Sequence, residues 1–164
     1  MLGVLADTHD DLAAARAAAD LFADRGADPV VHCGDVASPF ALAPFDRPDY
    51  EFHHVRGNNE GEPGLVAAVE AFGTHHGETA ELAVDGHDVA VYHGTSATLV
   101  DALVDCGRYD YVLHGHTHER GREERDGTVR VNPGGLPIPG ADDAFHVATV
   151  DPGSGDVTFH DLGV

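Results

Sequence analysis

Five short apolar runs, each ending in side chains that can bind metal, most constrain the fold of this chain. Each run has the length and apolar content of a buried strand, and a glycine introduces most of the polar residues. The runs lie at residues 2–6, 29–33, 51–56, 87–93 and 109–113. The side chains at their ends are Asp7, His9, Asp35, Asn58, His93, His116 and His118. In open α/β sheets ligands bind beyond the carboxyl ends of the strands, so these residues are expected to meet at one edge.

The segments between the runs predict helices and hairpins, and therefore a layered α/β fold. The predicted helices are 11–26, 64–73 and 96–107. The Asp85-Gly86 pair predicts a hairpin between 79–84 and 87–93. The last third predicts antiparallel strands within 122–132, 144–151 and 156–163, with turns at Asp126-Gly127 and Pro152-Gly153. With 164 residues and no linker or repeat, the chain is expected to be one domain, 1–164.

Each polar residue alone has an ordinary explanation, but together they predict a metal site. Asp7 and His9 could belong to a turn, Asp35 to a loop, and His93 to the core. Carboxylates, imidazoles and one amide without a thiolate suit Mn²⁺ (preferred here), Ni²⁺, Fe²⁺ or Zn²⁺ in a catalytic site better than a structural zinc site. A single ion rarely needs seven protein groups, whereas two divalent ions that share a carboxylate do. Such a pair activates a bridging water and clamps phosphoryl oxygens.

These motifs resemble a known enzyme family. Asp7-x-His9, Gly34-Asp35, Gly57-Asn58, His93 and Gly115-His116-x-His118 are similar, in this order, to the five motifs of the calcineurin-like metallophosphoesterases. The resemblance runs from residue 3 to about residue 150 and is strongest to the small phosphodiesterases of the YfcE type. The segment "VNPGGLP" (131–137) also resembles the strand and turn that follow the last motif in that subfamily. It implies a four-layer α-β-β-α sandwich of two mixed β-sheets flanked by helices, with metals at one end.

The resemblance also implies a ligand set and a reaction. One ion would be held by Asp7, His9, Asp35 and His118, and the other by Asp35, Asn58, His93 and His116, with Asp35 bridging. The implied activity is that of a dinuclear phosphodiesterase, in which a metal-bridging hydroxide attacks the phosphorus of a small phosphoester substrate.

Asn59 is a departure from many family members, which carry a histidine at this position to protonate the leaving group. An amide has no proton to donate at a useful pKa, and general-acid help is worth about 10²–10⁴-fold. The YfcE-type branch also lacks this histidine, so activity is not excluded. We expect a preference for good leaving groups, as in aryl phosphodiesters, and slow turnover of alkyl esters.

Other histidines and the cysteines are expected to be structural. His32 and His114 are candidates for supporting the ligands, because each lies beside a motif at a strand end. His53, His54, His75, His76, His87, His146 and His160 have no motif partner, and most are expected on the surface or on strand faces. Cys33 and Cys106 are expected to be buried small hydrophobic residues without a disulfide or a metal.

The charge pattern bears on the environment in which the protein works and on the partners that it can bind. The formal net charge is −20 and there is no lysine, which is typical of a protein from concentrated salt, where screening relieves self-repulsion. The alternative is an acidic protein from a GC-rich genome. Nine scattered arginines give no basic stripe for nucleic acid, and no apolar run approaches a membrane span. The amino terminus predicts a strand instead of a signal peptide, so a cytoplasmic location is expected.

Two other functions stay open at this point. The chain could be a same-fold scaffold that binds protein partners with a degraded site, as the retromer subunit of this architecture does. It could also be a metal store or a pH sensor. Competent residues at all seven ligand positions favour the enzyme over the scaffold. A homo-oligomer is possible, and the physiological substrate is not readable from the sequence.

Overall fold

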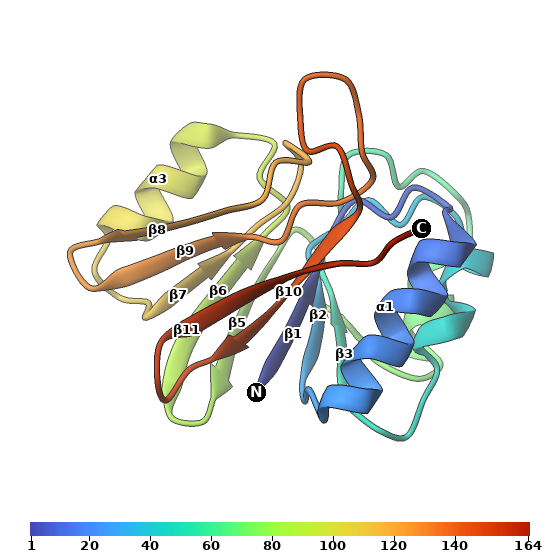
Figure 1. Cartoon of the computed structure of the whole chain (residues 1–164), viewed down its shortest axis with the longest axis horizontal. Helices are drawn as coiled ribbons and strands as arrows, with labels where there is room; N and C mark the ends of the chain where they lie inside the picture. The colour runs from blue at the N-terminus through green and yellow to red at the C-terminus, as the bar shows by residue number, and fades with distance from the viewer.

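Two β-sheets packed face to face form the centre of the molecule, in a computed structural model that describes residues 1–164 (Figure 1). The first sheet has the order β11-β10-β1-β2-β3-β4, and the second has the order β5-β6-β7-β9-β8. The strands of the first sheet are β1 Leu2–Leu5, β2 Val30–His32, β3 Phe52–His54, β4 Thr74–His75, β10 His146–Asp151 and β11 Asp156–Asp161. Those of the second sheet are β5 Thr79–Val84, β6 His87–Tyr92, β7 Tyr111–Leu113, β8 Gly121–Arg125 and β9 Thr128–Asn132.

Helices cover the outer face of each sheet and complete a four-layer arrangement. The helices α1 (Leu12–Arg25) and α2 (Leu65–Glu70) and the 3₁₀ helix η1 (Pro39–Phe45) share one buried apolar cluster with the first sheet. The helix α3 (Ala97–Asp105) packs on the second sheet, at the opposite side of the molecule from α1 in Figure 1. Both sheets contain parallel and antiparallel pairs, so the predicted α-β-β-α sandwich of two mixed sheets is confirmed.

Strand β1 shows how alternation builds both core layers. Leu2 and Val4 face the second sheet and belong to the inter-sheet core, whereas Leu5 faces α1. Gly3 also faces α1, and a Cβ at this position would lie 2.8 Å from the ring of Phe22. The glycine therefore lets the Ala-rich helix approach the sheet closely.

The predicted helices and hairpins are present, with differences in extent. Helix α1 begins after Asp11, whose side chain accepts hydrogen bonds from two N–H groups of the first turn, and ends at Gly26 in the left-handed conformation. Helix α2 is shorter than the predicted 64–73, and neither η1 nor β4 was predicted. A two-residue strand and a 3₁₀ turn that contains prolines carry too little periodicity to be recognised. The two C-terminal hairpins form, but they lie in different sheets, and β9 runs parallel to β7.

Parallel pairing brings the ends of the metal-motif strands to one edge. Strands β1, β2 and β3 are parallel in the first sheet, and β6, β7 and β9 are parallel in the second. Their carboxyl ends point to the upper edge in Figure 1, where the segment between β9 and β10 protrudes. No helix in the structure has the length and apolar character that a membrane crossing requires.

Candidate metal centre

A first compact group of possible ligands consists of Asp7, His9 and His118, which follow β1 and β7. The Nε2 atoms of His9 and His118 lie 3.2 Å apart, and the two rings are stacked. Asp7 Oδ1 lies 3.6 Å from His118 Nε2 and 3.8 Å from His9 Nε2. One oxygen and two nitrogens at these separations can face a single cation.

A second group consists of Asp7, Asp35 and His93, with Asn58 beside them. His93 Nε2 lies 3.4 Å from Asp35 Oδ2, 4.0 Å from Asp7 Oδ1 and 3.0 Å from Asn58 Oδ1. Asp35 Oδ2 also lies 3.7 Å from His9 Nε2, in the first group. Both carboxylates therefore reach both groups, whereas the resemblance implied sharing by Asp35 alone.

His116 lies beside these groups and belongs to neither. Its backbone N–H donates to Asp7 Oδ2 at 2.8 Å. Its ring meets the ring of His93 edge-on, with the centroids 5.3 Å apart. The structure thus places the polar side-chain atoms of six predicted ligands within 4.0 Å of another predicted ligand. His116 lies at the rim and contacts the centre through its backbone N–H and its ring.

The backbone at the centre is held in an uncommon conformation. Asp7, His9, Asp35, His116 and His118 all have positive φ, between 43° and 72°. A side chain with a Cβ rarely adopts this left-handed region, and each such residue costs of order 1–3 kcal/mol. The surrounding loops impose this conformation at the positions whose side chains point into the centre, which is typical of functional sites.

Glycines make room for the two carboxylates. A Cβ at Gly57 would lie 2.0 Å from Asp35 Oδ1, and a Cβ at Gly115 would lie 2.6 Å from Asp7 Oδ2. Both distances are far below van der Waals contact. The glycine that introduces a motif on one strand is therefore required by the carboxylate of another strand, which explains the pairing of glycine and ligand in the sequence.

Backbone carbonyl groups orient two of the imidazoles for ligation. His93 Nδ1–H donates to Cys33 O at 2.8 Å, and His118 Nδ1–H donates to Leu136 O at 2.7 Å. Because Nδ1 keeps the proton that it donates to the carbonyl, the proton that a cation can displace is the one on Nε2, the atom that each of these histidines presents to the centre. Such hydrogen bonds behind a ligand are a common feature of metal sites.

The charge balance of the centre fits cations. Asp7 is fully buried, and its Oδ1 has no hydrogen-bond partner, so a buried acceptor faces the other ligands unpaired. Burial raises the pKa of Asp7 to about 6. Burial also acts to lower the pKa of His93, but its hydrogen bond with Asp35 and the charge of that carboxylate raise it above its ordinary value. The site thus stabilises positive charge between its carboxylates, and divalent ions would satisfy Asp7 Oδ1.

Asn59 is directed at a ligand instead of the open side of the centre. Its backbone N–H donates to Asp35 Oδ1 and its Nδ2 donates to Asp35 Oδ2, both at 2.8 Å. Burial acts to raise the pKa of Asp35, but hydrogen bonds from His93 and Asn59 hold it well below its usual range. Asn59 therefore orients the Asp35 carboxylate and keeps it ionised.

Glu60 is a buried residue that sequence analysis missed. Its Oε1 accepts from Val36 N–H at 2.9 Å and from His54 Nε2–H at 3.0 Å, and its Oε2 accepts from Gly57 N–H at 3.1 Å. Glu60 therefore joins the loop that carries Asp35 to the loop that carries Asn58. In the sequence Glu60 is a single carboxylate two residues after Asn58, and nothing in the local pattern distinguishes it from a surface glutamate.

Three buried histidines outside the proposed ligand set have defined hydrogen-bond partners. His54, expected on a strand face or the surface, lies on β3, is fully buried and pairs with Glu60. His32 is also fully buried; its Nδ1 accepts from Gly34 N–H and its Nε2 contacts Thr8 Oγ1, both at 3.1 Å, so it contacts two motif loops. His114 accepts from Arg130 Nε–H at 2.9 Å and has no hydrogen bond to His116 or His118.

The two cysteines differ from each other. Cys33 is buried between the sheets, in agreement with the sequence. The expectation of burial is wrong for Cys106, which is exposed at the end of α3, on a side of the helix that the sheet does not cover.

Comparisons with known proteins agree with this geometry. A family model described as the calcineurin-like phosphoesterase superfamily domain matches residues 1–155. A phosphodiesterase of Methanocaldococcus jannaschii is 32% identical over 136 residues, which is 81% of this chain and 82% of that protein.

Solved structures share the fold. The structure of an archaeal phosphodiesterase superposes with a TM-score of 0.90 at 27% identity and covers 98% of both chains. The Escherichia coli phosphoesterase YfcE superposes with a TM-score of 0.67 at 18% identity and covers 98% of both chains. The second likeness concerns the fold alone, because its sequence identity is low.

Proposed function

The chain belongs to the calcineurin-like phosphoesterase superfamily, and on this basis we propose that it is a metal-dependent phosphodiesterase that cleaves P–O ester bonds at the centre formed by Asp7, Asp35 and His93. The observation that carries the proposal is the unpaired, fully buried Asp7 Oδ1, which faces imidazole nitrogens from three loops. A buried carboxylate oxygen without a partner is costly unless a cation binds it.

We propose the following ligands for two divalent ions, with Mn²⁺ preferred: Asp7, His9, Asp35, Asn58, His93, His116 and His118. When bound, the ions supply a Lewis acid for phosphoryl oxygens and lower the pKa of water. The carboxylates of Asp7 and Asp35 offset the charge of the ions, and carbonyl groups hold His93 and His118 in the ligating tautomer.

The substrate proposed is a small phosphodiester with a good leaving group. The similarity to phosphodiesterases from archaea supports a diester. Because Asn59 donates to Asp35, no side chain of this position delivers a proton to the leaving oxygen. Aryl phosphodiesters are therefore expected to react faster than alkyl diesters.

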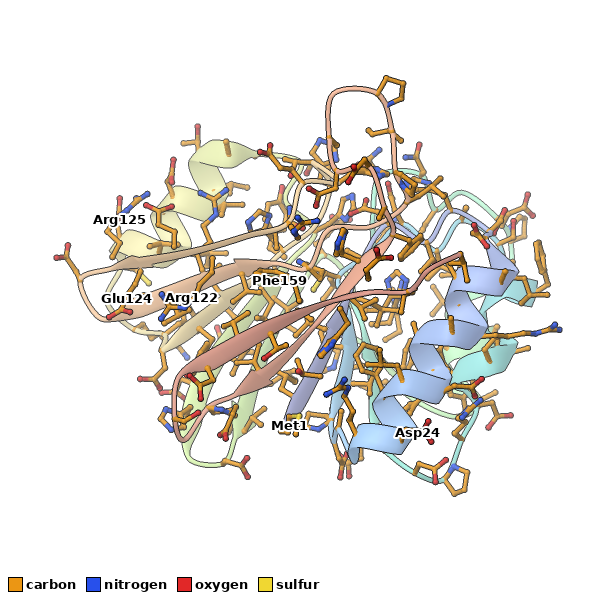
Figure 2. The ribbon with its side chains drawn as sticks, viewed as in Figure 1. Met1, Asp24, Arg122, Glu124, Arg125 and Phe159 are labelled. Atoms are coloured by element: carbon orange, nitrogen blue, oxygen red, sulfur yellow. The ribbon has the colours of Figure 1, made fainter.

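The test is hydrolysis of bis(p-nitrophenyl) phosphate by the Mn²⁺-loaded protein and by the Asp35→Asn variant. The expected result is turnover by the wild type and loss of nearly all of it in the variant. Asp24→Asn is the matched control, since Asp24 is exposed on α1 at the end of the molecule away from the centre (Figure 2). Equal activity of wild type and Asp35→Asn would reject the mechanism, and tight metal binding without any turnover would favour the scaffold function.

We also propose that the protein is adapted to high salt. The net charge of −20 and the absence of lysine support a protein adapted to high salt. A single domain over 1–164, a cytoplasmic location, a possible homo-oligomer and the absence of nucleic-acid or membrane partners are expectations from the sequence. Gel filtration in molar salt tests the oligomer.

A further inference from the structure

A polar cavity opens directly beside two of the proposed ligands. It has a volume of about 250 Å³ and is lined by Arg56, Gly57, Asn58, Glu78, Tyr92, His93 and Thr95. Arg56 is the only cation in this lining. Its guanidinium lies 3.8 Å from Glu78, and both side chains are more than half exposed, so this ion pair is weak. Arg56 is therefore available to an anion bound at the centre.

An apolar groove along α3 adjoins this cavity at Tyr92. Tyr92 lines both cavities, and Thr79, which follows Glu78 in the chain, lines the second. We call the second cavity the α3 groove; it has a volume of about 500 Å³ and is lined by Thr79, Tyr92, Leu99, Ala102, Leu103, Cys106, Arg108 and Tyr109. Tyr92 therefore forms a common wall between a charged region beside the centre and an apolar region along the helix.

The apolar character of the groove comes from a second stripe of α3. Leu99, Ala102, Leu103 and Cys106 are spaced as neighbours on one face of a helix. The residues that α3 buries against the second sheet are Val100 and Val104. Most of the stripe is left open by the chain itself. Leu99 is 53% exposed and Ala102 and Cys106 are exposed, whereas Leu103 is half-buried against the cluster of the second sheet. An apolar stripe that the fold does not need to cover is available to a ligand.

We propose that the two cavities form one substrate track, in which the phosphate lies at the centre beside Arg56 and an apolar ester arm of a phosphodiester lies in the α3 groove. The proposal rests on the proposed function and adds the class of substrate, a diester with one extended alkyl or aryl arm. An occupant joined to the phosphate is favoured because the track begins at Asn58 and His93 and changes from a polar to a mostly apolar lining along its length. Small-molecule sites commonly combine an apolar lining with a few polar groups in this way.

The test varies one arm at a constant leaving group. The substrates are p-nitrophenyl alkyl phosphates with arms from methyl to hexyl, and the readout is kcat/KM of the metal-loaded protein. The wild type is expected to gain about tenfold or more from methyl to hexyl. Leu99→Asp and Ala102→Trp, at two exposed positions of the groove, are expected to reduce this gain to about twofold while the methyl ester reacts as before. Val66→Asp is the matched control, because Val66 is 44% exposed on α2 and does not line the groove.

A binding measurement separates this inference from the proposed function. Calorimetry with methyl hexyl phosphate and dimethyl phosphate uses the Zn²⁺-loaded protein and does not depend on turnover. Tighter binding of the hexyl ester to the wild type and to Val66→Asp, but not to Leu99→Asp, supports the track even if no ester is hydrolysed. Equal binding of both esters to the wild type, or an unchanged hexyl preference in Leu99→Asp and Ala102→Trp, overturns it.

Discussion

Replacement of Glu60 by glutamine is expected to destabilise the protein because the carboxylate holds two metal-motif loops together. Both oxygens of Glu60 are in use, with Oε1 accepting from Val36 and His54 and Oε2 accepting from Gly57. In Glu60→Gln one of these oxygens becomes an NH₂ group that faces another donor. Burial acts to raise the pKa of Glu60, but the hydrogen bond and charge of His54 and the Val36 N–H lower it to about 2, from 4.5. This difference corresponds to about 3 kcal/mol of folding free energy.

The pH dependence of that loss has a definite sign. A carboxyl group whose pKa is lower in the folded protein stabilises the fold above its unfolded pKa, and this contribution disappears as the pH falls through the folded pKa. The free-energy difference between wild type and Glu60→Gln is therefore expected to be constant above about pH 5.5 and to shrink between about pH 4.5 and pH 2. Titrating groups that do not interact with Glu60 act alike on both proteins and cancel in the difference.

The assay is guanidinium unfolding of metal-free wild type and variant in molar salt across this pH range. Glu70→Gln is the control, because Glu70 is an exposed residue of α2, and it is expected to change stability by no more than about 0.5 kcal/mol. A loss in Glu60→Gln as small as that of the control would refute the reasoning. So would a loss that is as large near pH 3 as near pH 7. Metal affinity, measured separately, is expected to fall about 10–100-fold, as for other residues that support ligands.

Three further predictions concern the leaving group, a buried histidine and the net charge. Asn59→His is expected to flatten the dependence of kcat/KM on leaving-group pKa and to speed alkyl diesters relative to aryl diesters by about a hundredfold; an unchanged slope contradicts the assigned role. Burial, with a smaller contribution from the charge of Arg130, lowers the pKa of His114 to about 4. As the pH is lowered below about 6.5, this histidine is protonated in the unfolded chain before it is protonated in the folded protein, so the free energy of unfolding decreases. In unfolding experiments, His114→Gln is expected to reduce the change of the free energy of unfolding with pH by about 1.4 kcal/mol per pH unit. The same pH dependence in wild type and variant would argue against a neutral buried imidazole. With a net charge of −20, the unfolding midpoint is expected to rise steeply from low to molar NaCl, and a midpoint independent of salt removes the high-salt interpretation.

The positions of most strands and the residues at the strand ends were accessible to sequence analysis because both depend on local patterns. The apolar runs, the Asp-Gly turns and the glycine after α1 each indicate an element within a few residues of the chain. The direction of the parallel strands then places Asp7, Asp35, Asn58 and His93 at one edge, without any knowledge of side-chain contacts.

The partners of individual side chains required the tertiary structure. Asn59 was recognised as a departure from a motif, but its hydrogen bonds to Asp35 depend on how the loops after β2 and β3 meet. Glu60 and His54 form a buried pair for the same reason, although neither has a sequence signature. The exposure of Cys106 depends on which side of α3 the second sheet covers.

The sequence by itself thus determined the class of fold, the edge at which the centre forms and the chemical types of its ligands. The tertiary structure decided that both carboxylates reach both groups, that His116 lies at the rim, and that an apolar groove along α3 shares Tyr92 with the cavity beside the centre. The physical reason is the distance along the chain over which each kind of interaction acts. Hydrophobic periodicity and turn chemistry act between neighbours in the chain, whereas burial, hydrogen-bond partners and cavities arise only where distant segments pack together.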